Sequence, residues 1–422
     1  MWHRSPHLTY AISGVGSLTQ IMVKDILCIS NGHGEDRIAA YICRELLTLG
    51  VKVQALPLVG AGHSYGSLQI PLIINNEQNL PTGGFARSSA QALWQDIRGG
   101  LLVTTRQQWR LIKQWVTQHP QGLVLAVGDI VPLAMAWFSG AKYSFVATAK
   151  SEYYWRDSIG KLRGVPTPLG GSYFYPWERW LMHRSRCLAN FVRDELTRDY
   201  LHRYFHLPVS YCGNPMMDGL APQGIDLPIP ADEWTIVILP GSRPPESYHN
   251  WQTLLVCAQV ALRFLPHKVH FLAAIAPSLD ISTLEAILLQ KGWLKTRDNH
   301  FKLGNGELYL VANGFADCLQ RAHLGLAMAG TATEQMVGLA KPVITIAGTG
   351  PQFTKKFALE QKHLLGCAIN LIDKPAQTAE VLEWMLGSAD YFQLLVKNAQ
   401  ERMGASGASA QIAQRLAKLS LP

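Results

Sequence analysis

The sequence predicts an α/β protein built from two doubly wound, Rossmann-like domains. Apolar runs alternate with helical patterns in both halves of the chain, as in parallel sheets with crossover helices. A stretch rich in Pro and Gly without helical period, Met217–Glu233, separates the halves. The chain has 422 residues, more than one ordinary core accommodates, so two domains are expected.

The predicted strands are short apolar runs, typical of parallel strands covered on both faces. In the first half they are Asp25–Ser30, Val51–Leu58, Leu123–Val127, Tyr143–Thr148 and Cys187–Val192. In the second half they are Trp234–Leu239, Val269–Ala274, Tyr309–Val311, Leu324–Ala329 and Pro342–Ile346. Helices are predicted at Ile38–Leu49, Trp251–Phe264, Ile281–Gln290 and Thr333–Leu339.

We assign residues 22–212 to an N-terminal domain and residues 213–388 to a C-terminal domain. Residues 389–422 are predicted to form one C-terminal helix, roughly Ala389–Leu419, that packs back on the first domain. Residues 1–21 lack the long apolar stretch of a signal peptide and precede Met22. They are expected to be either a disordered leader or an overlong start assignment.

Composition narrows the class of protein. Hydrophobic residues make up 48% and charged residues 16%, as in folded globular proteins, and no apolar run is long enough to predict a transmembrane helix. The seven cysteines form no C-x-x-C pair, which argues against zinc or disulfides and fits a reducing cytosol. The net charge of +8 favours an acidic partner: nucleic acid, anionic lipid or a phosphorylated substrate.

Two motifs of the second half could bind phosphate. In "ILPGSRPPE", Gly241 and Ser242 directly follow a predicted strand, and Arg243 adds a guanidinium to their backbone N–H groups. In "LAMAGTATEQ", Gly330 allows close approach to the N–H groups of a first helical turn. The alternatives are a plain strand-ending turn in the first motif, and a Glu334 that only caps its helix in the second.

These motifs resemble the Leu-Pro-Gly-Ser-Arg-x-x-Glu and Ser-Gly-Thr-Ala-Thr-Leu-Glu stretches of lipid-A-disaccharide synthases, here Leu239–Glu246 and Ala329–Gln335. "YCGNPMMDG" (Tyr211–Gly219) is similar to the step that opens their second domain. The likeness spans most of residues 22–395, with the motifs concentrated in the second domain. The peptidoglycan N-acetylglucosaminyl transferase is a more distant relative of the same architecture.

The resemblance implies a GT-B glycosyltransferase, with two Rossmann-like domains facing a central cleft and a UDP-sugar as donor. The donor-binding residues that it implies are Gly213, Asn214, Gly241, Ser242, Arg243, Glu246, Gly330, Thr331, Ala332, Thr333 and either Glu334 or Gln335. The family's ribose-binding glutamate aligns with Gln335, whereas the carboxylate lies one residue earlier, at Glu334. This departure leaves the donor's identity open.

The first domain supplies two candidate catalytic bases. Asp129 follows a predicted strand, where a parallel sheet binds ligands, and is similar to an aspartate of lipid-A-disaccharide synthases; the alternative is a helix cap. His33 has an ordinary pKa suited to proton transfer, although a lone loop histidine is more often only solvated. Its loop, with Gly32, Gly34 and Glu35, is neither a Walker motif nor a full G-x-G-x-x-G, and we assign it to the acceptor side.

The sequence contains no Asp-x-Asp pair, so neither a metal nor a cofactor besides the sugar nucleotide is predicted. No acidic residue occurs between Asp96 and Asp129, and a basic amphipathic helix in this stretch suggests a membrane surface. Its predicted lipid-facing residues are Arg106, Trp109, Arg110, Lys113 and Trp115. A second aromatic and basic cluster spans Gly170–Arg186; the alternative for both is internal packing or a dimer contact.

We therefore expect a cytoplasmic glycosyltransferase, peripheral on the inner face of the membrane, that moves a sugar from a nucleotide diphosphate to a lipid or lipid-linked acceptor. The alternatives are a UDP-sugar 2-epimerase and a non-catalytic protein that binds a sugar nucleotide or lipid. No nucleic-acid motif is present. The oligomeric state is left open, with a homodimer among the alternatives.

Overall fold

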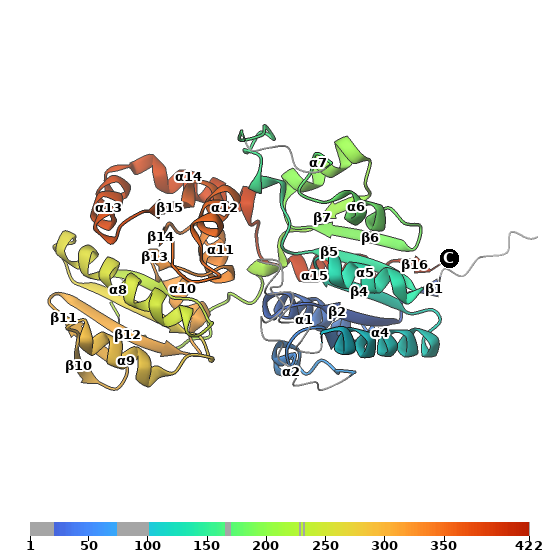
Figure 1. Cartoon of the computed structure of the whole chain (residues 1–422), viewed down its shortest axis with the longest axis horizontal. Helices are drawn as coiled ribbons and strands as arrows, with labels where there is room; N and C mark the ends of the chain where they lie inside the picture. Colours follow the sequence, from blue (N-terminus) through green and yellow to red (C-terminus); the bar gives the residue numbers. More distant parts are fainter. Residues whose placement is uncertain (1–20, 74–100, 165–169, 228, 231–232, 422) are drawn as a thin grey trace, which may run out of the picture.

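The chain folds into two sheets, each flanked by helices, that lie next to one another along the long axis of the molecule (Figure 1). The computed structural model describes residues 21–73, 101–164, 170–227, 229–230 and 233–421. The prediction of two doubly wound α/β domains is confirmed. The leader predicted at residues 1–21 lies outside the described residues, except for Ile21.

The first sheet is parallel and has the order β3-β2-β4-β5-β6-β7. Its strands are β2 (Asp25–Ser30), β3 (Lys52–Pro57), β4 (Leu123–Gly128), β5 (Lys142–Ala147), β6 (Cys187–Val192) and β7 (Val209–Tyr211). From β2 the chain first adds β3 on one side of β2 and then crosses back to add β4 on the other side. The strand order therefore reverses between β2 and β4, the position where open α/β sheets bind ligands.

Both faces of this sheet are buried, which explains the apolar character of its strands. The helices of this domain are α1 (His33–Thr48), α2 (His63–Ser67), α4 (Leu101–Gln118), α5 (Ile130–Ser139), η1 (Glu152–Tyr154), α6 (Pro176–Met182) and α7 (Glu195–Phe205). On β2, Ile26 and Cys28 belong to the core under α1. Leu27 and Ile29 belong to a separate core under α4, α5 and α6.

The second sheet has the order β10-β11-β12-β9-β8-β13-β14-β15, and only β11 runs antiparallel to its neighbours, β10 and β12. Its strands are β8 (Trp234–Leu239), β9 (Val269–Ile275), β10 (Leu294–Arg297), β11 (His300–Leu303), β12 (Gly306–Ala312), β13 (Leu324–Ala327), β14 (Val343–Ile346) and β15 (Ile369–Ile372). The parallel strands follow the Rossmann order, which reverses between β8 and β13.

The helices that follow the linker complete this domain and return to the first. They are α8 (Glu246–Phe264), α9 (Ile281–Gln290), α10 (Phe315–Arg321), α11 (Thr331–Gly338), α12 (Lys355–Leu365), η3 (Gly366–Ala368), η4 (Pro375–Gln377), α13 (Thr378–Gly387), α14 (Ala389–Arg402) and α15 (Ala408–Ala417). Short strands β1 (Ile21–Met22) and β16 (Ser420–Leu421) pair antiparallel.

The single helix predicted at Ala389–Leu419 is wrong: the chain forms α14 and α15 instead. Gly404 and Gly407 separate them, each with a positive φ that a helix does not allow (69° and 99°). Helix α14 packs on α11 of the second domain, whereas α15 packs on α1 of the first.

The hydrophobic core continues from the first domain into the second through the 3-10 helix η2 (Pro215–Met217). Met217 fits beside Gly338 at the end of α11, where an added Cβ would lie only 2.2 Å from its Sδ. The linker beyond η2 is held by the buried Asp317 of α10. Its carboxylate accepts hydrogen bonds from three consecutive backbone N–H groups, those of residues 223, 224 and 225, at 2.9–3.2 Å.

Replacing Asp317 tests this anchor. We expect Asp317→Ala to lower the free energy of unfolding by about 1–3 kcal/mol, because three linker N–H groups lose a charged acceptor. Urea denaturation followed by circular dichroism measures the change. The exposed Asp298→Ala is the matched control and should stay within about 0.5 kcal/mol of the wild type. Equal stability of the two variants would contradict the anchoring role.

Candidate active site at the domain junction

The strand-order reversals of the two sheets meet at the domain junction. His33 and Gly34 begin α1 after β2, Arg243 lies in the turn after β8, and Thr331 begins α11 after β13. A Cβ added to Gly34 would lie 3.5 Å from Oγ1 of Thr331, so the two domains are in close contact here. The positive charge of Arg243 also acts on His33 across the same junction. Residues predicted from three separate motifs thus lie close together at the junction.

His33 opens α1 and lies against the loop after β3. A Cβ added to Gly60 would lie 2.9 Å from Cε1 of the His33 ring, so this loop passes directly beside the imidazole. Although His33 remains accessible to solvent, partial desolvation, followed by the charges of Arg243 and His63, lowers its pKa. The imidazole is therefore neutral near neutral pH, the form that accepts a proton.

A buried polar cluster supports the His33 loop from below. Asp36, in the first turns of α1, is 1% exposed, and its Oδ1 accepts a hydrogen bond from Ser30 Oγ at 2.5 Å. The Ser30 hydroxyl also shares a 2.5 Å hydrogen bond with the Tyr65 hydroxyl of α2. Burial raises the pKa of Asp36 to about 7, against the opposing effect of the Ser30 hydrogen bond. The cluster ties β2, α1 and α2 together around His33.

Asp129 lies at the end of β4 and caps α5. Its Oδ1 accepts a hydrogen bond from the backbone N–H of Val131 at 2.7 Å. Asn31, Glu35 and Gly128 crowd together nearby: a Cβ added to Gly128, whose φ is +131°, would lie 2.1 Å from Asn31 Oδ1 and 3.3 Å from Glu35 Cγ. The capping role that the sequence left open for Asp129 is thus present in the structure.

Arg243 extends from the turn after β8, which is held in place by residues that sequence analysis missed. Asn250 of α8 donates hydrogen bonds to the carbonyls of Pro240 and Met328, at 3.0 and 3.4 Å, and so ties the two phosphate-motif loops together. Gln361 of α12 donates to the carbonyls of Ala329 and Gly330, at 3.0 and 3.2 Å. Both are buried amides within helices, a position that gives no local sequence signal.

Glu334 and Gln335 have different surroundings. Gln335 is buried, and its amide donates a 2.8 Å hydrogen bond to the carbonyl of Met216 in η2, at the start of the linker. Glu334 lies at the junction, where its Oε2 accepts a 2.7 Å hydrogen bond from Arg193 of the first domain. Arg193 directly follows β6, and a charged residue at the carboxyl end of a predicted strand is the signal that could have identified it.

Several other residues predicted to bind the donor make contacts within the second domain or the linker. Asn214 is buried and caps η2 through the Met216 N–H at 3.1 Å, and Gly213 precedes it beside α15. The carboxylate of Glu246 accepts hydrogen bonds from the backbone N–H groups of residues 352 and 353. Thr333 is buried and donates to the Ala329 carbonyl at 2.7 Å. Ser242, Thr331 and Ala332 remain partly or fully exposed.

The predicted lipid-facing helix is α4, and one of its residues was assigned to the wrong face. Trp115 is buried, and its Nε1 donates a 2.7 Å hydrogen bond to Gln54 Oε1 of β3. The inner face of α4 also includes Gln108, which donates to the Leu58 carbonyl at 2.9 Å. The face of α4 that carries Gln108 and Trp115 is therefore the buried one. Trp109 lies on the opposite, exposed face, with Lys113 Nζ 5.7 Å from the centre of its ring. Arg106 and Arg110 are exposed.

Helices α4, α5 and α6 lie side by side along the first sheet (Figure 1). Each of them carries exposed aromatic side chains. Phe138, Trp177 and Trp180 are 60%, 49% and 45% exposed, and the Arg184 guanidinium lies 4.2 Å from the Trp180 ring centre. The only carboxylate within α4, α5 and α6 is that of Glu178, which is buried and paired with Lys150. We call this surface the aromatic–basic face.

A pocket of about 420 Å³ lies near the junction but at the other ends of the same helices. It is lined by the C-terminal parts of α1 and α11, the linker and residues 404–410, and it contains none of the predicted catalytic or donor-binding residues. The described part of the chain contains no cluster of three or more His, Cys, Asp or Glu side chains arranged to hold a metal ion. None of its helices is both long and apolar enough to cross a membrane.

Solved structures that include a glycosyltransferase and a UDP-GlcNAc 2-epimerase share this fold. They include CalG4, the calicheamicin glycosyltransferase (TM-score 0.62, 15% identity, covering 95% of this chain and 100% of that one). UDP-GlcNAc 2-epimerase from Neisseria meningitidis, bound to UDP-GlcNAc, has a TM-score of 0.57 at 13% identity, covering 94% and 100%. MurG from Acinetobacter baumannii has a TM-score of 0.56 at 14% identity, covering 94% and 100%.

These likenesses identify the fold as that of the GT-B class. At such low sequence identities they extend to the fold alone, and both transferases and epimerases occur among the similar structures. No protein-family model matches the sequence, and a comparison with curated proteins finds no match.

The electrostatics of His33 can be measured directly. We expect its pKa, followed by NMR of the ring proton, to lie below the ordinary value of about 6.5. Arg243→Gln should raise it, because removing a nearby positive charge favours the protonated ring. Arg263→Gln, an exposed substitution on α8 of the same domain, is the control. An unchanged His33 pKa in Arg243→Gln would show that the two groups are not coupled.

Proposed function

We propose that the protein is a metal-independent glycosyltransferase that moves a sugar from a UDP-sugar to a lipid-linked acceptor. The observation that carries this proposal is the meeting of the two strand-order reversals, which brings His33 and Arg243 to the same junction. One domain offers a proton acceptor and the other an anion site. A transfer reaction requires both, because the acceptor hydroxyl loses a proton while the donor releases a nucleoside diphosphate.

The donor site of this proposal lies in the second domain. Arg243 and the backbone N–H groups at the start of α11 would bind the diphosphate and stabilise its charge as the glycosidic bond breaks. Glu334 is better placed than Gln335 for the ribose, because the Gln335 amide is buried against Met216. The fold, shared with sugar-nucleotide enzymes, supports this class of donor.

The acceptor site lies on the first domain, and we propose His33 as its base. Its lowered pKa keeps the imidazole neutral, whereas the Asp129 carboxylate already caps α5. His33 would take the proton of the attacking hydroxyl, with the Asp36–Ser30–Tyr65 cluster holding its loop in place. Gly34 lets this loop approach Thr331 closely enough for the two substrates to react.

The aromatic–basic face supports a lipid-linked acceptor and a peripheral position on the cytoplasmic side of a membrane. Exposed Trp side chains beside arginines and lysines are typical of segments that bind an anionic lipid surface. The resemblance of the donor motifs to those of lipid-A-disaccharide synthases supports the same class of acceptor.

A UDP-sugar 2-epimerase is the second candidate, favoured by the epimerases among the similar folds. It would act on the sugar nucleotide without an acceptor. A non-catalytic protein that binds a sugar nucleotide would show binding and no turnover. The aromatic–basic face has no role in the epimerase reaction.

Binding and turnover assays separate these functions. We expect UDP-sugars to bind by calorimetry and to release UDP only when a lipid extract is present. His33→Ala should keep donor affinity but lose about 100-fold or more of the turnover rate, because it removes the base. His202→Ala, on the exposed side of α7, is the control and should be fully active. Conversion of the UDP-sugar without lipid would favour the epimerase, and the absence of binding would exclude all three functions.

Flotation with vesicles tests the membrane surface. The wild type should float with phosphatidylglycerol vesicles at low salt, and Trp177→Ser/Trp180→Ser should reduce the floating fraction severalfold by removing interfacial aromatics. Trp384→Ser removes a similarly exposed Trp (51%) from the second domain and should behave as wild type. Equal flotation of all three proteins would place the membrane contact elsewhere.

A further inference from the structure

An ion pair joins the first domain to the donor side of the junction. Arg193 follows β6 and is 2% exposed, whereas Glu334 lies in the first turns of α11. Nη2 of Arg193 donates a 2.7 Å hydrogen bond to Oε2 of Glu334. Among the described residues, no hydrogen bond reaches the other carboxylate oxygen, Oε1 of Glu334. The carboxylate is thus held by one oxygen and has the other available.

Besides Glu334, the guanidinium is held by the first domain and by Met403, which directly follows α14. Nη1 of Arg193 donates to the Thr148 carbonyl at the end of β5, at 3.3 Å, and Nη2 also lies 3.4 Å from Sδ of Met403. The next residue, Asp194, caps α7 through the backbone N–H of Thr197 at 2.8 Å. Arg193 therefore cannot follow Glu334 if that side chain moves.

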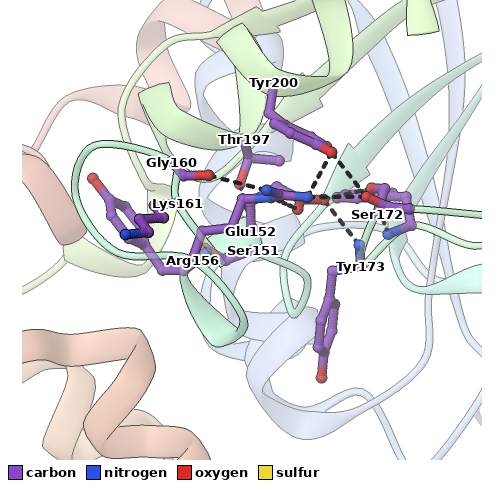
Figure 2. Close-up of polar contacts among 12 residues, drawn as sticks. Ser151, Glu152, Arg156, Gly160, Lys161, Ser172, Tyr173, Thr197 and Tyr200 are labelled. Atoms are coloured by element: carbon purple, nitrogen blue, oxygen red, sulfur yellow. Dashed lines mark hydrogen bonds and ion pairs between the residues drawn. The ribbon is translucent and has the colours of Figure 1, made fainter. Parts of the chain in front are cut away.

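A dense hydrogen-bond network holds the segments next to Arg193 in place (Figure 2). Thr197 Oγ1 accepts a 2.9 Å hydrogen bond from the backbone N–H of Glu152. The buried Glu152 carboxylate accepts hydrogen bonds from Ser172 Oγ, the Tyr173 N–H and Arg156 Nε, at 2.5, 2.9 and 3.0 Å (Figure 2). This network joins η1, α7 and residues 171–173, and α7 starts two residues after Arg193 in the chain.

Separating the ion pair would leave a buried guanidinium without its carboxylate. Such separation is strongly unfavourable, because the charge has already lost its hydration. A ligand that needs Glu334 is consequently bound by the carboxylate while Oε2 stays on Arg193. The ligand then meets Oε1, in an orientation that the first domain determines.

We propose that Arg193 is a positioning residue of the donor site: it holds Glu334 so that Oε1 accepts a hydrogen bond from a ribose hydroxyl of the nucleotide. The first domain thereby contributes to recognition of a donor that the second domain binds. This inference rests on the proposed function, because it takes the donor to be a UDP-sugar. Arg193 itself does not touch the nucleotide; it acts through Glu334.

The test compares UDP with 2′-deoxy-UDP and 3′-deoxy-UDP by calorimetry. We expect the wild type to bind UDP about tenfold or more tightly than at least one deoxy form, because a hydrogen bond to a carboxylate is lost. Arg193→Met should lose this preference, so that the ratio of dissociation constants approaches one. A general loosening of the site would weaken all three nucleotides alike and leave the ratio unchanged.

Further variants make the result specific to this pair. Arg193→Lys keeps the charge but lacks the planar fork that spans Glu334, Thr148 and Met403, so its preference should fall severalfold. The double variant Arg193→Met/Glu334→Gln should show the same preference for UDP over the deoxy forms as Glu334→Gln alone. The reason is that both changes act through the same contact. Arg198→Met on α7, which removes a surface arginine paired with Glu195 and Asp199, should match the wild type.

Each result decides the question. The inference is overturned if Arg193→Met and Arg193→Lys keep the wild-type preference, and Arg193→Lys decides alone if Arg193→Met does not fold. It is also overturned, with the proposed function intact, if the wild type binds UDP but does not distinguish the deoxy forms. If the wild type binds none of the three nucleotides, the proposed function fails as well.

Discussion

The packing of the linker into both cores is the constraint on which the rest of the structure depends. Met217 occupies the space that Gly338 leaves at the end of α11, and the core around it continues under α1. This contact joins the two domains, together with the Arg193–Glu334 ion pair and the packing of α12 on η1. Because α1 and α11 start at the strand-order reversals, fixing their far ends directs their N-termini toward each other. The closeness of Gly34 and Thr331 follows from it.

The junction assigns different roles to side chains that are similar in sequence. Asp36 and Glu35 are neighbours, yet Asp36 is buried beneath the loop whereas the charge of Glu35 acts on Arg243. Glu334 and Gln335 are likewise adjacent, and successive helical positions point one toward the junction and the other into the linker. The orientation of a helix, more than the chemistry of each residue, decides which group can meet a ligand.

Features that depend on residues adjacent in the sequence could be predicted, whereas contacts between residues far apart in the sequence could not. Apolar strands followed by glycine turns revealed both domains and the loops of His33, Arg243 and Thr331. Strands β7, β10, β11 and β15 were among those missed; β10 is exposed and charged, and the two central residues of β15 are only partly buried. Trp115 was assigned to the exposed face of α4 because the hydrophobic pattern does not show that the polar Gln108, on the same face, is buried. The Arg193–Glu334 pair spans 141 positions, and no local pattern links such residues.

The return of the chain to its first domain has a consequence for how the protein is made. Helix α15 covers α1, and β16 pairs with β1, so the first domain contains residues from both ends of the described chain. During synthesis, α1 emerges from the ribosome long before the helix that covers it. The second domain, whose sheet is complete by Ile372, can therefore finish folding first. Until α15 arrives, the part of α1 that α15 covers stays exposed to water.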